Sequence, residues 1–369
     1  MNFEGKAIVG ADFRFLVPAG SGESARLEVG GRERIRCGRV RCGGFSEANG
    51  LLQRLRGHQA ADALSGSIDS TWVIPFGCEY EVERDIEIFD GCAEWTCDLR
   101  AVNRGMVRAV ELEPVVFSGP WTGLDLLLPG DRAVRRIALA EGETELYRGG
   151  EPPVLLSLTA ADGIRVEYAL GGDLWRHRAA LRLEHATGEF LLTGGRGRLT
   201  LERRIFQFDD EAVVEKRPWR FRTLFAWSGV SLPAAGEGTG EERFDLASAE
   251  IPEGARRLAA DGTRLRSGCL SSSPVRKLIR DRIRRAGGDL RIENVDFGIC
   301  ADGAHLERPG RGALAHCDLD DGCSFYLWGN RQLHRQGRRL RLLTAAESPF
   351  AGSVLAENLG RCPRPVSVE

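Results

Sequence analysis

The stretch YEVERDIEIFDGCAEWTCDLRA, residues 80–101, decides the fold. Apolar and polar residues alternate on both sides of the pair Asp90-Gly91, which is the pattern of two strands that each have one buried face. Asp-Gly is a preferred pair for the tight turn of a β-hairpin, because its residues reach positive φ at low cost. The stretch therefore predicts an antiparallel hairpin with a core-facing side and a side rich in carboxylates.

The same pattern recurs along the chain. A second hairpin is predicted from residue 154 through Asp162-Gly163 to residue 168. Further strands are expected at 107–116, 180–184, 190–193, 198–208, 221–227, 290–297, 324–328 and 339–343. This pattern indicates an all-β, mostly antiparallel protein in which two sheets pack as a large sandwich.

One amphipathic helix is expected at residues 274–286. Ser273 is a suitable N-cap, and Pro274 suits the first helical position. Apolar residues then recur at helical spacing, at Val275, Leu278, Ile279 and Ile283. A shorter helix is expected at 47–56. We expect one large domain over residues 1–369, with a surface loop or a boundary at 229–254, where periodic apolar residues are sparse.

Charge is balanced overall but unevenly distributed. The formal net charge of the 369 residues is -2, and all but three of the 51 lysine and arginine residues are arginine. Residues 256–285 hold ten basic residues against two acidic ones, whereas residues 79–98 hold eight acidic residues against one arginine. Nucleic-acid binding would use the basic segment, but the overall acidity argues against it. The favoured interpretation is that the acidic and basic segments contact each other, either within one chain or between two copies. The partner predicted by the second of these is a second copy of the chain, in a homo-oligomer.

Export and membrane insertion are not expected. The first residues contain no long apolar run, and no stretch approaches the roughly 20 apolar residues that cross a bilayer. A cytoplasmic location is therefore expected, with the ten cysteines reduced. Their spacing does not form paired CxxC elements, no HExxH motif occurs, and the run at 318–322 fails the calcium-loop pattern. No metal and no cofactor is predicted.

Polar residues that interrupt an apolar strand are the first candidate site. Glu293 and Asp296 lie within LRIENVDFG, residues 290–298, where uncompensated burial of a charge would be costly. They either reach solvent in a cleft, as an acid–base pair would, or pair with arginine, for which Arg291 lies on the same strand face. His316 and His305 lie in the following glycine-rich region, where a histidine beside a carboxylate could transfer protons near neutral pH. Glu293, Asp296 and His316 are the candidate catalytic residues, and His305 is a candidate for substrate binding.

Two tryptophans are candidates for sugar stacking, because the C–H faces of sugars are apolar. Trp121 lies in SGPWTG and Trp175 in GGDLWRHR, so both are flanked by loop-forming or polar residues. An open position would make either ring a binding platform, whereas a buried one would make it part of the core.

The stretch from Tyr80 to Phe117, YEVERDIEIFDGCAEWTCDLRAVNRGMVRAVELEPVVF, resembles the β-supersandwich of the galactose mutarotase-like group. The later hairpin LTAADGIRVEYALGG is compatible, and the resemblance covers roughly residues 70–230. It implies a supersandwich fold, which also occurs as a domain of many carbohydrate-active enzymes. The substrate loop of the mutarotases, which resembles His-x-Tyr-Phe, has no counterpart here, and their catalytic Glu has no matching position. Their catalytic roles therefore do not transfer to this chain.

These observations predict a protein that binds or modifies a carbohydrate. If it is an enzyme, the reaction could be of the epimerase, lyase or hydrolase type. The alternative is a non-catalytic interaction or assembly protein, in which the acidic hairpin and the basic helix make subunit contacts. A pocket with convergent carboxylates would favour the first interpretation, and a filled sandwich with a large interface the second.

Overall fold

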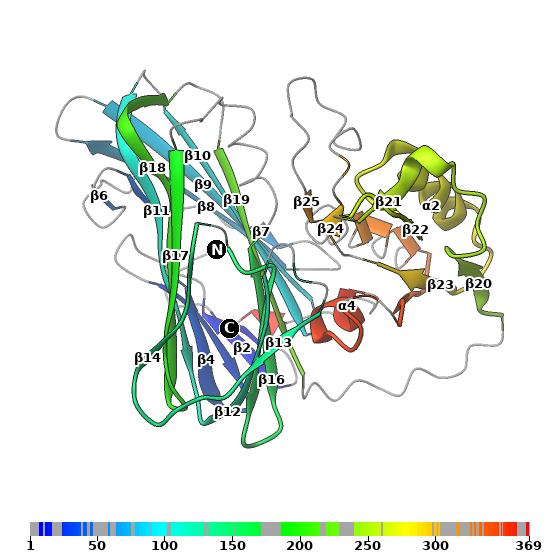
Figure 1. The fold of residues 1–369 in the computed structure, drawn as a ribbon, viewed down its shortest axis with the longest axis horizontal. Helices are drawn as coiled ribbons and strands as arrows, with labels where there is room; N and C mark the ends of the chain where they lie inside the picture. The colour runs from blue at the N-terminus through cyan, green and yellow to red at the C-terminus, as the bar shows by residue number, and fades with distance from the viewer. Residues whose placement is uncertain are drawn as a thin grey trace.

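The computed structural model shows a two-sheet sandwich with a smaller layer beside it (Figure 1). The structure describes residues 7–9, 12–16, 24–37, 40–42, 45–46, 58–59, 64–74, 78–89, 91–101, 105–128, 131, 133–150, 152–170, 186–214, 219–228, 240–259, 261–296, 299–300, 302, 316–317, 325–326, 328–329, 332–333, 336–346, 348, 350–359 and 367–368.

Antiparallel strands build both sheets of the sandwich, as predicted. Across the first sheet the order is β14 (Thr144–Gly149), β17 (Ala186–Gly194), β18 (Arg198–Val214), β11 (Gly105–Ser118), β4 (Arg32–Cys37), β3 (Ala25–Val29), β2 (Phe13–Leu16), β1 (Ala7–Val9) and β27 (Ser367–Val368). Two short strands, β5 (Val40–Cys42) and β6 (Phe45–Ser46), extend this sheet beside β11. Across the second sheet the order is β13 (Arg135–Ile137), β12 (Trp121–Leu127), β15 (Leu155–Ala160), β16 (Arg165–Leu170), β19 (Trp219–Trp227), β10 (Cys92–Ala101), β9 (Cys78–Phe89), β8 (Leu64–Ile74) and β7 (His58–Gln59).

Both predicted hairpins are present. Phe89 pairs with Cys92, which leaves Asp90-Gly91 as a two-residue connection, and Gly91 has a φ of 76°. The second turn is longer, because the Ala160 N–H donates to the Ile164 carbonyl at 2.8 Å across three residues. There Gly163 has a φ of 83°, whereas Asp162 stays outside the positive-φ region and accepts the Ile164 N–H on its carboxylate at 3.2 Å. Only the glycine of that pair therefore needs the left-handed conformation.

Most of the predicted strands are confirmed, and one is wrong. The segments 107–116, 190–193, 198–208 and 221–227 lie inside β11, β17, β18 and β19. The predicted strand 180–184 and the predicted helix 47–56 lie outside the described residues. The segment 324–328 is helical in its described part, at residues 325–326 and 328–329. Phe325 and Trp328 stack there with ring centroids 5.7 Å apart, a contact that helical i, i+3 spacing provides and strand spacing does not.

Large side chains fill the space between the two sheets. Among those with less than 2 % exposure are Trp121, Trp227, Tyr168, Phe117 and Phe190. Tyr168 contacts Phe117 edge-on at 5.8 Å between ring centroids, a favoured aromatic geometry. The interior of the sandwich is therefore a packed core in the part that the structure describes.

A smaller layer with a parallel sheet lies against the sandwich, a feature that the sequence pattern did not predict. Its strands are β20 (Glu242–Asp245), β23 (Leu290–Val295) and β26 (Leu340–Thr344), which pair in that order and run parallel. The other elements of this layer are η2 (Glu253–Ala255), β21 (Arg256–Leu258), β22 (Arg264–Gly268), α2 (Ser273–Arg285), β24 (Ile299–Cys300), β25 (His316–Cys317) and α4 (Val354–Leu359). Parallel neighbours need a crossover, and α2 supplies the one from β20 to β23.

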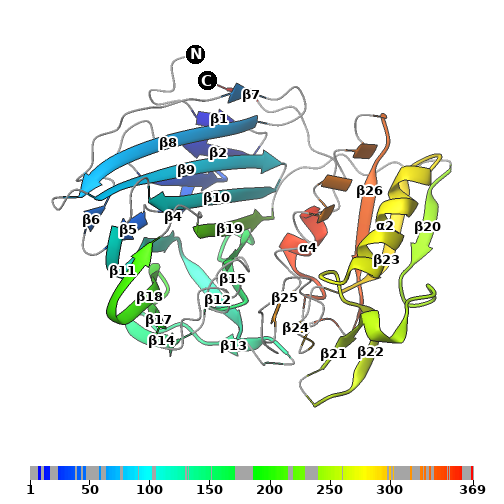
Figure 2. The same cartoon turned by 90° about the horizontal axis from the view of Figure 1, so that it is seen from above.

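The predicted amphipathic helix is confirmed as α2, with its start shifted by one residue. Ser272 is the N-cap residue, and Pro274 lies in the first turn. Val275, Ile279 and Ile283 are buried in a second core. This core also contains residues on the outer face of the second sheet, such as Cys92 and Leu224, so the layer packs directly on the sandwich (Figure 2).

Candidate functional site

The carboxyl ends of the three parallel strands bring polar side chains to one edge of the small sheet. Asp245 ends β20, Asn294 and Asp296 lie at the end of β23, and Ser348 follows β26. The pairing of β23 with β26 is irregular between Ile292 and Val295. In open α/β sheets ligands bind at this kind of edge, so we take these residues as the candidate site.

Asn294 has an unusual backbone conformation. Its φ of 58° makes it the one non-glycine residue with positive φ in the described part of the chain. Asparagine tolerates this region better than most residues, but the conformation still has a cost. Its amide Nδ2 donates to Asp245 Oδ1 at 2.6 Å, so the strained residue is tied to the neighbouring strand.

Asp245 accepts several hydrogen bonds at this edge. The hydrogen bond from Asn294 lowers the pKa of Asp245, partial burial opposes that shift, and a hydrogen bond from the Ala247 N–H at 2.9 Å lowers the pKa further. Both Asp245 and Asn294 are half-buried. The pair therefore offers solvent a fixed carboxylate and a fixed amide at the ends of two adjacent strands.

Asp296 is buried, with 8 % exposure, and its charge is compensated. Arg257 of β21 makes an ion pair through Nε to Oδ2 at 3.1 Å, at an angle outside hydrogen-bond geometry. Ser267 Oγ donates to Oδ2 and Ser348 Oγ donates to Oδ1, each at 3.0 Å. Arg257 also donates to the Asp296 carbonyl oxygen at 2.7 Å. Both carboxylate oxygens of Asp296 therefore have partners. Through these contacts Asp296 holds β21 against the end of β23.

Glu293 pairs with arginine, which is one of the two environments expected for it from the sequence; the other was a solvent-filled cleft. Arg291 Nε lies 2.8 Å from Glu293 Oε1, and both side chains are 27 % exposed. Arg291 also approaches Glu241 at 3.8 Å, which in turn lies 3.4 Å from Arg341. Glu293 is thus part of a charged ladder across the small sheet and shares none of these partners with Asp296.

Of the remaining candidates, the structure describes the backbone of His316 and the side chain of Trp121. His316 lies in β25, where its backbone pairs with Cys300. Trp175 and His305 lie outside the described residues. Trp121 has 0 % exposure, its Nε1 donates to the Phe117 carbonyl at 3.4 Å, and the Arg34 guanidinium lies over its ring at 5.7 Å. The expectation that Trp121 offers an open stacking surface is therefore wrong, because β12 turns this side chain between the two sheets.

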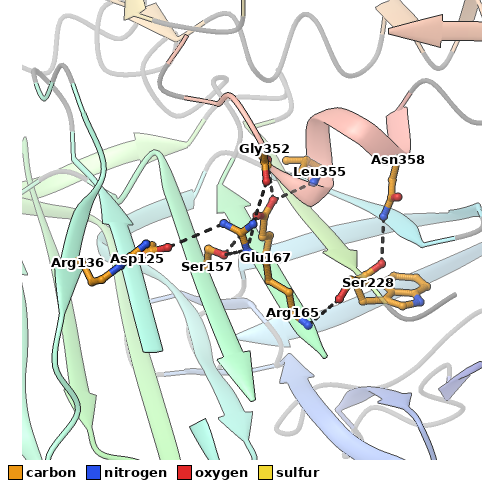
Figure 3. A network of polar contacts seen from close by, with 11 residues as sticks. Asp125, Arg136, Ser157, Arg165, Glu167, Ser228, Gly352, Leu355 and Asn358 are labelled. Carbon is orange, nitrogen blue, oxygen red and sulfur yellow. Dashed lines mark hydrogen bonds and ion pairs between the residues drawn. The ribbon is translucent and has the colours of Figure 1, made fainter. Parts of the chain in front are cut away.

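Sequence reasoning missed a buried carboxylate, Glu167 of β16, which has 0 % exposure (Figure 3). Its Oε2 accepts hydrogen bonds from Ser353 Oγ at 2.7 Å and from the Leu355 N–H at 2.8 Å. Its Oε1 accepts from Ser157 Oγ at 3.3 Å and lies 3.4 Å from Arg165 Nε. A glutamate in the otherwise apolar strand RVEYAL was the available signal, the same signal that singled out Glu293 and Asp296.

The contacts around Glu167 join the two layers. Arg165 donates to the Gly352 carbonyl at 2.8 Å (Figure 3). Asn358 Nδ2 donates to the carbonyls of Gly91 at 2.6 Å and Trp227 at 3.1 Å. Burial raises the pKa of the adjacent Cys92 thiol far above its usual range, and the charges of Glu94 and Glu167 raise it further. These hydrogen bonds and ion pairs attach α4 and the residues just before it, 352–358, to the sandwich.

Three further observations concern metal sites, membrane-spanning helices and cysteines. Within the described ranges, no group of three or more His, Cys, Asp or Glu residues is placed to hold a metal ion. No helix among those residues is long and apolar enough to span a membrane. The structure describes five cysteines with their side chains, and all five are buried thiols outside any disulfide: Cys37, Cys92, Cys97, Cys269 and Cys300.

Solved structures with a partly similar arrangement include an α-N-acetylgalactosaminidase, a putative aldose 1-epimerase and a galactose mutarotase-like protein. An α-N-acetylgalactosaminidase from Bifidobacterium bifidum is 10% identical with a TM-score of 0.41, and the match covers 92% of this chain and 58% of that one. A putative aldose 1-epimerase from Escherichia coli K12 is 9% identical with a TM-score of 0.32, covering 61% and 99%. A galactose mutarotase-like protein from Clostridium acetobutylicum is 7% identical with a TM-score of 0.35, covering 60% and 94%. No protein-family model matches the sequence, and no curated protein sequence matches it.

Proposed function

We propose that this protein binds a carbohydrate at the carboxyl edge of β20 and β23. The observation that carries the proposal is Asn294, which is held at a φ of 58° with its amide bonded to Asp245. Backbone strain of this kind persists where the surrounding structure enforces it, and it concentrates at binding sites.

The chemistry of the two side chains suits a polyol. A sugar presents adjacent hydroxyl groups, each of which donates and accepts a hydrogen bond. A carboxylate supplies two acceptor oxygens, and an asparagine amide supplies a carbonyl acceptor and two donor hydrogens. Asp245 stays ionised over a wide pH range because its pKa is lowered. Asp296 stabilises the end of β23 beside this pair through its contacts with Arg257, Ser267 and Ser348.

Binding is proposed ahead of catalysis because the predicted acids are engaged elsewhere. Asp296 has both oxygens occupied, which suits a positioning residue better than a proton donor. Glu293 pairs with Arg291. Catalytic roles for Glu293 and His316, and substrate contacts of Trp175 and His305, stay predictions from the sequence.

The test is a glycan array read together with thermal stability. Asn294→Gly removes the amide while allowing positive φ, and Asp245→Asn removes the charge while keeping the shape. Both variants should lose glycan binding while remaining folded, and Asp245→Asn should lower the melting temperature modestly at neutral pH, because the pKa of Asp245 is lowered in the folded state. Asp296→Asn should lose both binding and stability, because it leaves Arg257 buried beside a neutral partner.

Asp289→Asn is the matched control. Asp289 lies just before β23, at the opposite end of the strand, where it accepts the Arg339 N–H at 2.9 Å and pairs with its guanidinium at 3.2 Å. This variant should bind glycans as the unmodified protein does. The proposal fails if the unmodified protein binds no glycan on the array, or if Asn294→Gly and Asp245→Asn bind as well as the control.

A further inference from the structure

Three arginines lie side by side across the small sheet. In the register of the parallel strands, Arg243 of β20 lies opposite Arg291 of β23, and Arg291 lies opposite Arg341 of β26. We call these three residues the arginine row. Neighbouring strands are only about 4.8 Å apart, and like charges at side-by-side positions of a sheet are destabilising. The arginine row is therefore stabilised by anions placed beside it.

The arginine row lies on the face of the small sheet that α2 does not cover. Phe244 lies on the other face, where it packs against the core that contains α2 and has the Arg282 guanidinium over its ring at 5.5 Å. Successive residues of a strand point to opposite faces, so Arg243 and Asp245 share the face away from α2. Arg243 is exposed, and Leu343 of β26, which alternation places on the same face, has 43 % exposure. At these positions the face is open to solvent.

Carboxylates of the chain neutralise two members of the arginine row. Arg291 Nε lies 2.8 Å from Glu293 Oε1, and Glu241 lies 3.8 Å from Arg291 and 3.4 Å from Arg341. The third member, Arg243, makes no ion pair with a residue that the structure describes. Arg243 is therefore the member of the row that is placed to pair with an added anion.

Arg243 is also the member of the row that lies beside the proposed glycan site. It precedes Asp245 by two residues on the same face of β20, a separation of about 6.6 Å along a parallel strand. Asp245 in turn accepts the hydrogen bond from Asn294 Nδ2 at 2.6 Å. A short glycan whose hydroxyl groups bind Asp245 and Asn294 can therefore present a charged substituent to Arg243.

We propose that the glycan bound at Asp245 and Asn294 is acidic, and that Arg243 binds its carboxylate or phosphate group. A guanidinium keeps its charge at every physiological pH, and its planar set of N–H donors binds either anion through two parallel hydrogen bonds. This inference rests on the proposed function, because it names the class of glycan that the same site binds.

The basic side chains of α2 are a second group of exposed cations in this layer. Lys277 and Arg284 are exposed and lie one on each side of Arg280 along the helix. Because α2 packs on the opposite face of the small sheet, these cations lie across the sheet from Asp245 and Asn294. They therefore provide a control for attraction of acidic glycans by positive charge in general.

The experiment measures binding of the full chain to an array that carries matched neutral and acidic glycans. It includes oligogalacturonides beside their methyl esters, and mannose oligosaccharides with and without a 6-phosphate. The unmodified protein should bind the acidic member of at least one pair more strongly, and this preference should shrink between about 0.05 M and about 0.5 M sodium chloride because salt screens the charges. The pair that shows the preference identifies the anion as carboxylate or phosphate.

Arg243→Gln is the test variant. It should bind the acidic glycan at least about tenfold more weakly, as expected for loss of a hydrogen bond to a charged group. It should keep the affinity of the unmodified protein for the neutral member of the pair. Its melting temperature should be unchanged, because the side chain is exposed and has no ion pair with a described residue.

Two control variants remove arginine or lysine elsewhere. Arg136→Gln changes a side chain of β13 with 87 % exposure. The double variant Lys277→Gln with Arg284→Gln removes two cations from α2. Both controls should bind the acidic glycan as the unmodified protein does, and circular dichroism establishes that every variant is folded.

The outcomes separate this inference from the proposed function. Binding of neutral glycans with no preference for their acidic partners overturns the inference and leaves the proposed function standing. An acidic preference that Arg243→Gln does not weaken, or that the α2 double variant weakens equally, also overturns it, since the anion is then bound elsewhere or by charge in general. Absence of binding to every glycan on the array overturns both.

Discussion

Replacement of Glu167 by glutamine should release the segment of α4 from the sandwich while leaving the two sheets intact. The substitution keeps the size of the side chain but removes its charge and exchanges one acceptor oxygen for a donor. Glu167 Oε2 accepts hydrogen bonds from Ser353 Oγ at 2.7 Å and from the Leu355 N–H at 2.8 Å, while Oε1 faces Ser157 and Arg165. A glutamine amide has a single acceptor oxygen, so it can accept hydrogen bonds on one of these two sides only and places its NH₂ group on the other.

The magnitude follows from the partners that remain. Removal of one member of a fully buried ion pair costs about 3–5 kcal/mol. Arg165 is 32 % exposed and keeps its hydrogen bonds to the Gly352 carbonyl and to Ser157 Oγ, each at 2.8 Å, which favours the lower end of that range. We therefore expect a loss of about 3 kcal/mol in the local stability of α4, which corresponds to roughly a hundredfold increase in its opening equilibrium.

Amide hydrogen exchange measured by mass spectrometry is the assay, because it reports opening of individual segments. The peptide that contains residues 350–359 should exchange about a hundredfold faster in Glu167→Gln, whereas peptides from β11 and β18 should be unchanged. Ser353→Ala is the graded control. It removes one hydroxyl donor, costs about 1 kcal/mol, and should speed exchange of the same peptide roughly fivefold.

Unchanged protection of residues 350–359 in Glu167→Gln would refute the reasoning, because it would show that the buried carboxylate does not hold α4. Equal acceleration in all peptides would refute it in another way, since Glu167 would then support global stability rather than this one attachment.

Two further predictions concern the candidate residues. Asp245→Asn should lower the free energy of unfolding at neutral pH, because the folded state lowers the pKa of Asp245. The difference in unfolding free energy from the unmodified protein should narrow as the pH falls below about 4, where the carboxylate becomes protonated. Urea unfolding at neutral pH and at a pH below about 4 checks this, and a constant difference would contradict it. Trp121→Ala should cost about 3–5 kcal/mol in unfolding free energy, as expected for a large buried ring, without a specific loss of glycan binding; a stable variant that loses binding would show that the ring contacts ligand.

Local patterns predicted the strands well where one face is buried and the other is not. Residues 80–101 form the expected hairpin because alternation fixes which face meets the core, and the Asp-Gly pair fixes the turn. The helix at α2 was equally visible, since its apolar residues recur at helical spacing and Pro274 lies in its first turn. The segment 324–328 was misread because a short apolar run is compatible with a strand or with a helix, and the contact between Phe325 and Trp328 decides between them.

The candidate site was only partly predictable. The sequence singled out Glu293 and Asp296 because both interrupt an apolar strand, and it offered arginine pairing as one explanation. It did not show that Arg257 and Ser267, from a separate hairpin, complete the surroundings of Asp296. Asp245 was not among the candidates, because its contact with Asn294 joins residues 49 positions apart.

The sequence by itself determined the antiparallel sandwich, its hairpins and the amphipathic helix, because each depends on periodicity and turn chemistry over a few neighbouring residues. Only the tertiary structure decided that β20, β23 and β26 form a parallel sheet, that Trp121 is buried, and that Glu167 locks α4 to the sandwich. The physical reason is that these features come from contacts between segments distant in the chain. Such contacts are set by how whole layers pack, which local residue patterns do not record.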